Sequence, residues 1–149
     1  MTDPEAVIPV PLLNDVRRAS VSELGFVYDP LLVTRMQEII VARIRRGDVG
    51  EGITYAQLVR YAQAPSWVAH RGLLGHILAL VSVKSYEEDG VLLGALVRVR
   101  EADTPPTTDF CQLLEQLGVV RSRHHREDCL ELWDHHWKLA VSQLDRAVS

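Results

Sequence analysis

Residues 66–78, SWVAHRGLLGHIL, carry an indole, two imidazoles and a guanidinium within an apolar helical pattern. If a helix begins near residue 67, Trp67, His70 and Arg71 gather at its first turn. A recognition helix carries base-contacting side chains there, and an arginine can also bind phosphate. The pattern therefore predicts a nucleic-acid contact. The alternative, which stays open here, is that Trp67 packs against the N-terminal arm of the chain while His70 and Arg71 are solvated.

Charge is distributed unevenly along the chain, whose net charge is −4. Residues 53–100 contain 5 basic and 3 acidic residues, whereas residues 1–52 contain 6 and 8 and residues 101–149 contain 5 and 9. Lysine and arginine supply most nonspecific affinity for nucleic acid, so an acidic chain needs a local basic surface to bind it. The interface predicted in the basic third consists of Arg60, Trp67, His70, Arg71, Lys84, Arg98 and Arg100.

Histidine and cysteine near the C-terminus raise the question of a metal site. His125 and Cys129 are one helical turn apart, and His136 follows seven residues later, about 10 Å further along a helix. Two ligands do not hold zinc stably, and the third is too distant without another segment. We therefore predict no metal and no cofactor, and we interpret these histidines as the polar side of a helix.

Motifs of the common catalytic sites are missing from the sequence. It contains no glycine-rich phosphate loop, no GxSxG, no HExxH and no HNH nuclease motif. The pattern favours a non-catalytic protein, with an enzyme site assembled from distant residues as the minor alternative.

Hydrophobic periodicity indicates the elements that position these residues. Asp29 and Pro30 begin a helix whose arginines before Gly47 complement the helix dipole, with phosphate contact as the alternative. Leu93, Ala95 and Val97 alternate with other residues, which predicts a strand with one buried face. The expected elements are a helix over 29–46, two helices over 54–62 and 66–83, a strand over 91–100, a short helix over 107–118 and an amphipathic helix over 126–149. The predicted apolar stripe of this last helix is Leu130, Trp133, Trp137, Ala140, Leu144 and Ala147.

This order predicts a mainly helical α+β fold with a winged helix-turn-helix-like core. The length of 149 residues fits one domain, residues 29–149, preceded by an N-terminal arm, residues 1–28, in which a short helix can form. The predicted core comprises Leu58, Leu74, Ile77, Leu93, Ala95, Val97, Phe110, Leu114, Trp133 and Trp137.

Two families show similar motifs. TYAQLVRYA and HRGLLGHIL resemble the paired helices of the DNA-binding domain of the alkylguanine alkyltransferases, but the PCHR motif with the nucleophilic cysteine is missing. Residues 53–140 more closely resemble a bacterial family of small winged-helix-like domains associated with restriction-type HNH nucleases. The matching features, in order, are Thr54, Tyr55, Leu58, Arg71, Gly75, Ile77, GVLLGALVRV, PPTTDFCQLLEQLG and Trp133; the family's glycines are replaced by proline and threonine in PPTTDF.

The resemblance implies a winged-helix-like binding domain of a defence or restriction-like system, with double-stranded DNA as the expected partner. The alternative function is a protein-interaction module that does not bind nucleic acid. A partner protein or a second copy of the chain would then dock on the C-terminal helix. The apolar runs are too short to span a membrane and no signal sequence is apparent, so we expect a cytoplasmic protein.

Overall fold

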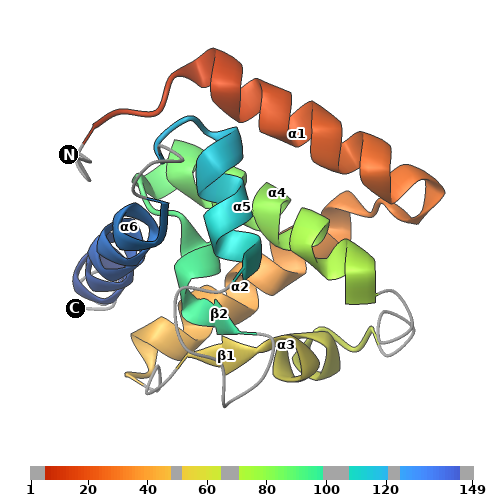
Figure 1. Ribbon diagram of the computed structural model, residues 1–149. Coiled ribbons are helices and arrows are strands. Elements are labelled where there is room, and N and C mark those ends of the chain that lie inside the picture. Colours follow the sequence, from red (N-terminus) through yellow and green to blue (C-terminus); the bar gives the residue numbers. More distant parts are fainter. Residues whose placement is uncertain (1–5, 48–51, 65–70, 99–107, 121–124, 145–149) are drawn as a thin grey trace.

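The structure, a computed structural model, describes residues 6–47, 52–64, 71–98, 108–120 and 125–144 (Figure 1). Its α-helices are α1 (Val10–Leu24), α2 (Pro30–Arg45), α3 (Tyr55–Tyr61), α4 (Arg71–Asp89), α5 (Thr108–Gln116) and α6 (His125–Leu139). Strands β1 (Ile53–Thr54) and β2 (Val97–Arg98) pair in parallel. The predicted mainly helical α+β class is thus confirmed.

The helices α2 and α3 begin where their capping residues predict. The carboxylate of Asp29 accepts a hydrogen bond from the Leu31 N–H, and Pro30 occupies the first position of α2. Thr54 and Gln57 form a reciprocal capping box at the start of α3. Because β1 ends at Thr54, the chain passes directly from the sheet into α3.

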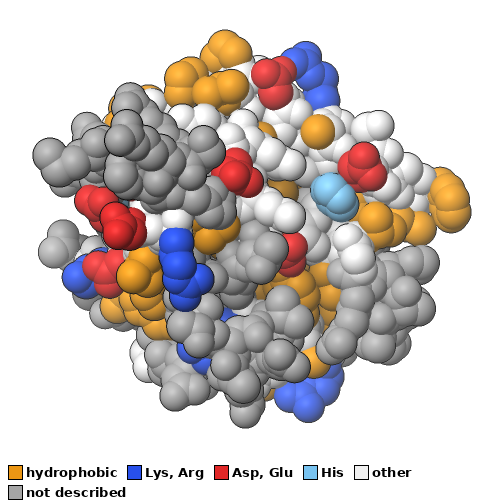
Figure 2. Space-filling view, in the orientation of Figure 1, with side chains coloured by type: hydrophobic (Ala, Val, Ile, Leu, Met, Phe, Trp, Pro, Cys, Tyr) orange, Lys and Arg blue, Asp and Glu red, His pale blue; other side chains and the backbone are white. Residues whose placement is uncertain are grey.

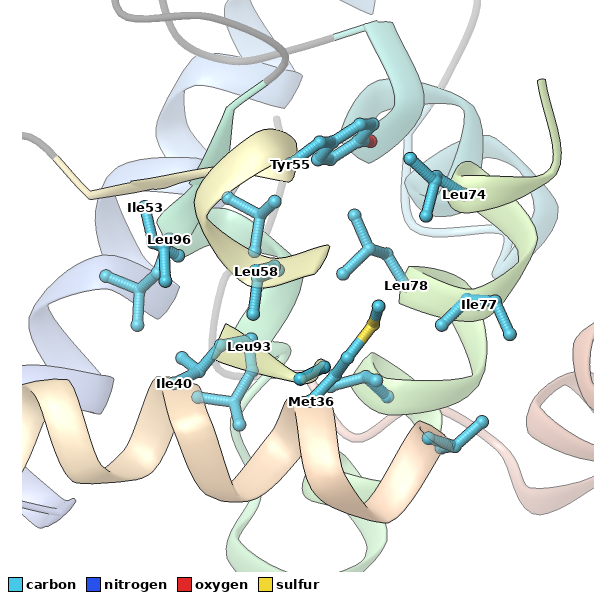
Figure 3. Close-up of a cluster of buried hydrophobic side chains, with 14 of the residues drawn as sticks. Met36, Ile40, Ile53, Tyr55, Leu58, Leu74, Ile77, Leu78, Leu93 and Leu96 are labelled. Carbon is cyan, nitrogen blue, oxygen red and sulfur yellow. The ribbon is translucent and has the colours of Figure 1, made fainter. Parts of the chain in front are cut away.

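A first hydrophobic core lies between α2, α3 and α4 (Figure 3). Met36 and Ile40 of α2, Leu58 of α3 and Ile77 of α4 are each no more than 1% exposed. Full burial of such a side chain contributes roughly 1.5–3 kcal/mol. These contacts therefore fix the position of the short helix α3, which is too short to be stable by itself.

A second core joins α1 to α4, α5 and α6. Leu13 of α1, Leu114 of α5 and Leu132 of α6 are buried there. Trp133 packs against this core and Trp137 against the first, with their ring centroids 5.4 Å apart. Both indoles are half-buried rather than fully enclosed. The other eight predicted core residues, Leu58, Leu74, Ile77, Leu93, Ala95, Val97, Phe110 and Leu114, are buried as expected.

Residues 91–97, here called the central segment, run between the two cores and are all buried. Val91 and Leu93 belong to the first core, whereas Leu92 and Ala95 belong to the second. The prediction of a one-faced strand is wrong for most of this stretch, because Leu93–Leu96 form a 3₁₀ helix and only Val97–Arg98 form a strand. The chain is apolar here because both of its sides face protein.

Backbone groups of the central segment find their partners in side chains of α4 and α6. A buried N–H or C=O without a partner is costly, and a segment with so little regular structure cannot supply enough partners itself. Ser85 Oγ donates to the Val91 carbonyl (2.6 Å) and accepts from the Leu93 N–H (3.3 Å). Ser82 Oγ accepts from the Gly94 N–H (2.9 Å), and His136 Nδ1 accepts from the Leu92 N–H (3.1 Å). Trp133 Nε1 donates to the Ala95 carbonyl (2.8 Å).

Two helices are longer than their sequence patterns indicate. The predicted arm contains the 15-residue helix α1, which lies across α4 (Figure 1). Helix α4 continues through the polar residues 84–89, where a break was expected, and ends before Gly90 with φ +75°. Its polar side chains are accommodated by contacts with other helices, including an ion pair between Glu87 and Arg17 of α1.

The buried side of α6 also differs from the predicted stripe. Leu130 is 48% exposed, whereas Cys129, Leu132 and His136 are buried. The hydrophobic pattern placed Leu130 on the buried side of the helix and did not place His136 there. His136 can be buried because its ring Nδ1 accepts a hydrogen bond from the Leu92 N–H. A π-helical turn, Ala140–Leu144, follows α6. None of the helices in the described ranges combines the length and apolar character required to cross a membrane.

Candidate nucleic-acid interface

A group of arginines lies where α2 packs beside α3. Arg35 and Arg43 of α2 both contact the end of α3, at residues 62 and 61. The Arg35 guanidinium donates a hydrogen bond of 2.8 Å to the Ala62 carbonyl, which follows α3. This bond satisfies a carbonyl at the end of α3 and holds the two helices together.

Tyr61, the last residue of α3, is the centre of this surface. Its side chain is 50% exposed, and the guanidinium carbons of Arg43 and Arg60 lie 6.0 Å and 5.4 Å from its ring centroid. An arginine is attracted to the face of an aromatic ring at these distances. Two cations from different helices are thereby held beside one exposed ring, an arrangement suited to an anionic ligand that also carries aromatic groups.

Further arginines extend the positive surface toward the C-terminal end of α2. Arg45 and Arg46 are exposed, and neither forms an ion pair with a described residue. We define the α2–α3 basic surface as Arg35, Arg43, Arg45, Arg46, Arg60 and Tyr61. In Figure 2, Lys or Arg side chains are visible at the lower edge of the face shown, near α3 in Figure 1, and others lie at the top and left of centre beside acidic side chains.

Apart from Lys84, the interface residues predicted from sequence divide into three groups. Arg60 lies on the α2–α3 basic surface. Arg98 is half-buried on β2, where the parallel pairing places it opposite Thr54, the cap of α3. Trp67, His70 and Arg100 lie outside the described residues, as does the side chain of Arg71, although Arg71 is the first residue of α4.

Lys84 lies far along α4 from the first residue of that helix. It follows Arg71 by thirteen residues on one helix, which corresponds to about 20 Å of rise. Its ammonium donates hydrogen bonds to Gln37 (2.7 Å) and to Glu88 (2.9 Å). Hydrogen bonds from Lys84 and Gln37 lower the pKa of Glu88. Lys84 therefore links α4 to Gln37 of α2, and its part in the interface stays a prediction.

Tyr61 and Arg43 were missed as a pair by sequence reasoning. The arginines before Gly47 were recognised as potential phosphate contacts, and Tyr61 directly follows the predicted residue Arg60. The missing information was the packing of α2 against α3, which brings residues 43 and 61 together. The available signal was the adjacency of an aromatic residue and an arginine at the end of an amphipathic helix.

His136 and Cys129 of α6 and Cys111 of α5 lie in the packed interior between helices. Burial, with a smaller contribution from His135, lowers the pKa of His136 to about 4. Burial also raises the pKa of the Cys111 and Cys129 thiols, which are hydrogen-bonded to each other between α5 and α6. Within the described ranges, no group of three or more His, Cys, Asp or Glu side chains is placed to hold a metal ion.

Comparison with family models, with curated proteins and with solved structures found no match to this chain. The geometry of the α2–α3 basic surface therefore carries the functional argument.

Proposed function

We propose that the protein binds nucleic acid through the α2–α3 basic surface and has no catalytic role. The observation that carries this proposal is Tyr61, which is half-exposed and flanked by Arg43 and Arg60. Arginines beside an exposed aromatic ring provide phosphate contacts and a stacking surface, the two elements of sequence-tolerant nucleic-acid binding.

The arrangement of the remaining predicted residues is part of the same proposal. In a winged-helix-like domain, α4 would take the place of the recognition helix, with Trp67, His70 and Arg71 near its start, and the residues after β2, including Arg100, would take the place of the wing. Arg98, opposite Thr54, would lie between the wing and α3. A role in a restriction-like system rests on the sequence resemblance alone.

Binding can be tested by fluorescence anisotropy with labelled double-stranded and single-stranded DNA at low and moderate salt. Arg60→Ala should weaken binding and reduce the salt dependence by roughly one released counterion, because one phosphate contact is lost. Tyr61→Ala should weaken binding by about 1–3 kcal/mol if a base stacks on the ring. Both side chains are exposed, so neither change should unfold the protein.

Two control variants sharpen this test. Tyr61→Phe keeps the ring and should bind almost as the wild type does. Arg18→Ala removes an exposed arginine of α1, which lies on the opposite side of the molecule from α3 (Figure 1). Wild-type protein that binds neither DNA at low salt, or equal loss of binding in Arg18→Ala and Arg60→Ala, contradicts the proposal.

A further inference from the structure

Phe26 is the most exposed large hydrophobic residue among those described. It lies in the 3₁₀ turn Gly25–Val27 between α1 and α2 and is 101% exposed. Leu31, at the start of α2, is 71% exposed, and Tyr28 between them is 37% exposed. Full exposure of a phenylalanine beside other apolar side chains is typical of an interaction surface rather than of a solvated turn.

A groove of about 290 Å³ lies next to this turn, between α1, the start of α2, and α4. Val33 and Leu80, each 6% exposed, provide its apolar part, and Tyr28 and Pro30 line the side nearest Phe26. The volume is sufficient for one aromatic side chain. Tyr28, which lines the groove, is two residues from Phe26 in sequence, so the turn that carries Phe26 is close to the groove.

A side chain that protrudes next to a groove suits a two-fold symmetric interface, because the patch is then complementary to itself. In such an interface the same patch of each copy contacts its equivalent, so each copy inserts its side chain into the groove of the other. We propose that the groove between α1, α2 and α4 receives Phe26 of a second copy of this chain, in a two-fold symmetric dimer.

Charge around the two features supports a second copy as the occupant. Phe26 is flanked along the chain by Glu23 and Asp29, both exposed. The charged residues that line the groove are Arg17, Lys84 and Glu87, so cations outnumber carboxylates in its lining. These cations already pair with Glu87 and Glu88, but the pairs are partly exposed and thus weak, and each cation can bind a second carboxylate. An inserted Phe26 would bring acidic residues toward these cations.

The area available sets the expected strength of the dimer. One buried aromatic side chain removes roughly 150–250 Å² from water, and the symmetric contact doubles this contribution. With Tyr28 and Leu31 the interface remains at the small end of specific protein interfaces. We therefore expect a dimer that dissociates on dilution, with a dissociation constant of micromolar order.

Sedimentation equilibrium of the full chain across about 1–200 µM tests the proposal, given a micromolar dimer. The wild type should pass from monomer to dimer over this range. Phe26→Ser should raise the dissociation constant by roughly thirtyfold or more, as expected for a central aromatic residue of an interface. Leu130→Ser is the matched control because Leu130 is exposed on α6, and it should leave the dimer unchanged.

Disulfide trapping distinguishes insertion into the groove from other contacts. Phe26→Cys protein mixed with Thr34→Cys protein should form a mixed disulfide under mild oxidation, because Thr34 lines the groove. A monomer at every concentration, an unchanged dissociation constant in Phe26→Ser, or loss of the dimer in Leu130→Ser would overturn the proposal; the last result would place the interface on the C-terminal helix. A dimer without the mixed disulfide would refute the groove as the site of Phe26. Nucleic-acid binding does not enter this experiment.

Discussion

His136 shows how a single residue makes this fold sensitive to pH. Its ring is buried and its Nδ1 accepts the Leu92 N–H, so the folded state requires neutral imidazole at that atom. The pKa of His136 is about 4 in the folded protein, below the ordinary value of 6.5. Above about pH 6.5 the ring is neutral in both states. As the pH falls from about 6.5 to about 4, the unfolded chain takes up a proton that the folded chain excludes, and stability is lost.

We predict that this residue alone lowers the free energy of unfolding by about 3 kcal/mol between pH 7 and pH 4. Urea denaturation at several pH values measures the effect. His136→Gln keeps an acceptor but has no proton to bind, so the pH dependence should be smaller by this amount. His135→Gln, the adjacent control, should retain most of the wild-type dependence. Parallel pH profiles for wild type and His136→Gln would contradict this account.

At the scale of elements, the close approach of β1 to the chain before β2 depends on a glycine. Gly52 immediately precedes β1 and has φ +96°. A Cβ atom at this position would lie 2.6 Å from the Leu96 carbonyl oxygen and 3.5 Å from the Trp137 ring. Another residue would therefore suffer both an unfavourable backbone conformation and a collision with a backbone atom that cannot easily move.

Gly52→Ala is expected to destabilise the protein by about 2–4 kcal/mol, as the sum of backbone strain and overpacking. Gly72 offers a control of the same chemistry, because it lies in α4 with no atom near its missing Cβ. Gly72→Ala should stabilise the helix by roughly 0.5–1 kcal/mol. Chemical denaturation of both variants decides the matter, and equal stabilities would refute the role assigned to Gly52.

Local signals in the sequence predict the elements that depend on local chemistry. The Asp29 and Thr54 caps locate α2 and α3, and Gly118 ends the short helix α5, which the sequence placed over 107–118. The central segment could not be predicted in this way, because its conformation depends on Ser82, Ser85, Trp133 and His136 from distant helices. Its alternating pattern does not mark one buried face, because Leu93 and Val97 pack in the first core and Ala95 packs in the second.

The candidate site, too, could be predicted only where local signals in the sequence were sufficient. Arg60 could be identified from composition and position, whereas its partnership with Arg43 and Tyr61 required the packing of two helices. The partners of Lys84 could not be predicted either, because a basic residue on a predicted helix carries no information about the residues that contact it. Gln37 and Glu88, which occupy its ammonium, are separated from each other by 51 residues in sequence.

For the whole molecule, the two proposals have a joint geometric consequence. The N-terminal part of α2 lines the groove, and its C-terminal part carries Arg43 and Arg45. A 16-residue helix is about 24 Å long. In a dimer formed through the groove, the α2–α3 basic surfaces would therefore lie away from the two-fold axis, one on each copy. Such a dimer could contact nucleic acid at two separated positions and gain affinity from both.

The central segment also has a consequence for the exchange of amide hydrogens with solvent. Irregular backbone usually exchanges quickly, because local opening exposes its N–H groups. Here the amides of Leu92, Leu93 and Gly94 are bonded to side chains of α4 and α6, and they can open only if both cores separate. We predict that these three amides are among the slowest in the protein and exchange at the rate set by global unfolding. Native-state exchange followed by NMR at increasing denaturant would show this, whereas exchange as fast as that of Val119, beyond the end of α5, would mean that the two cores open independently.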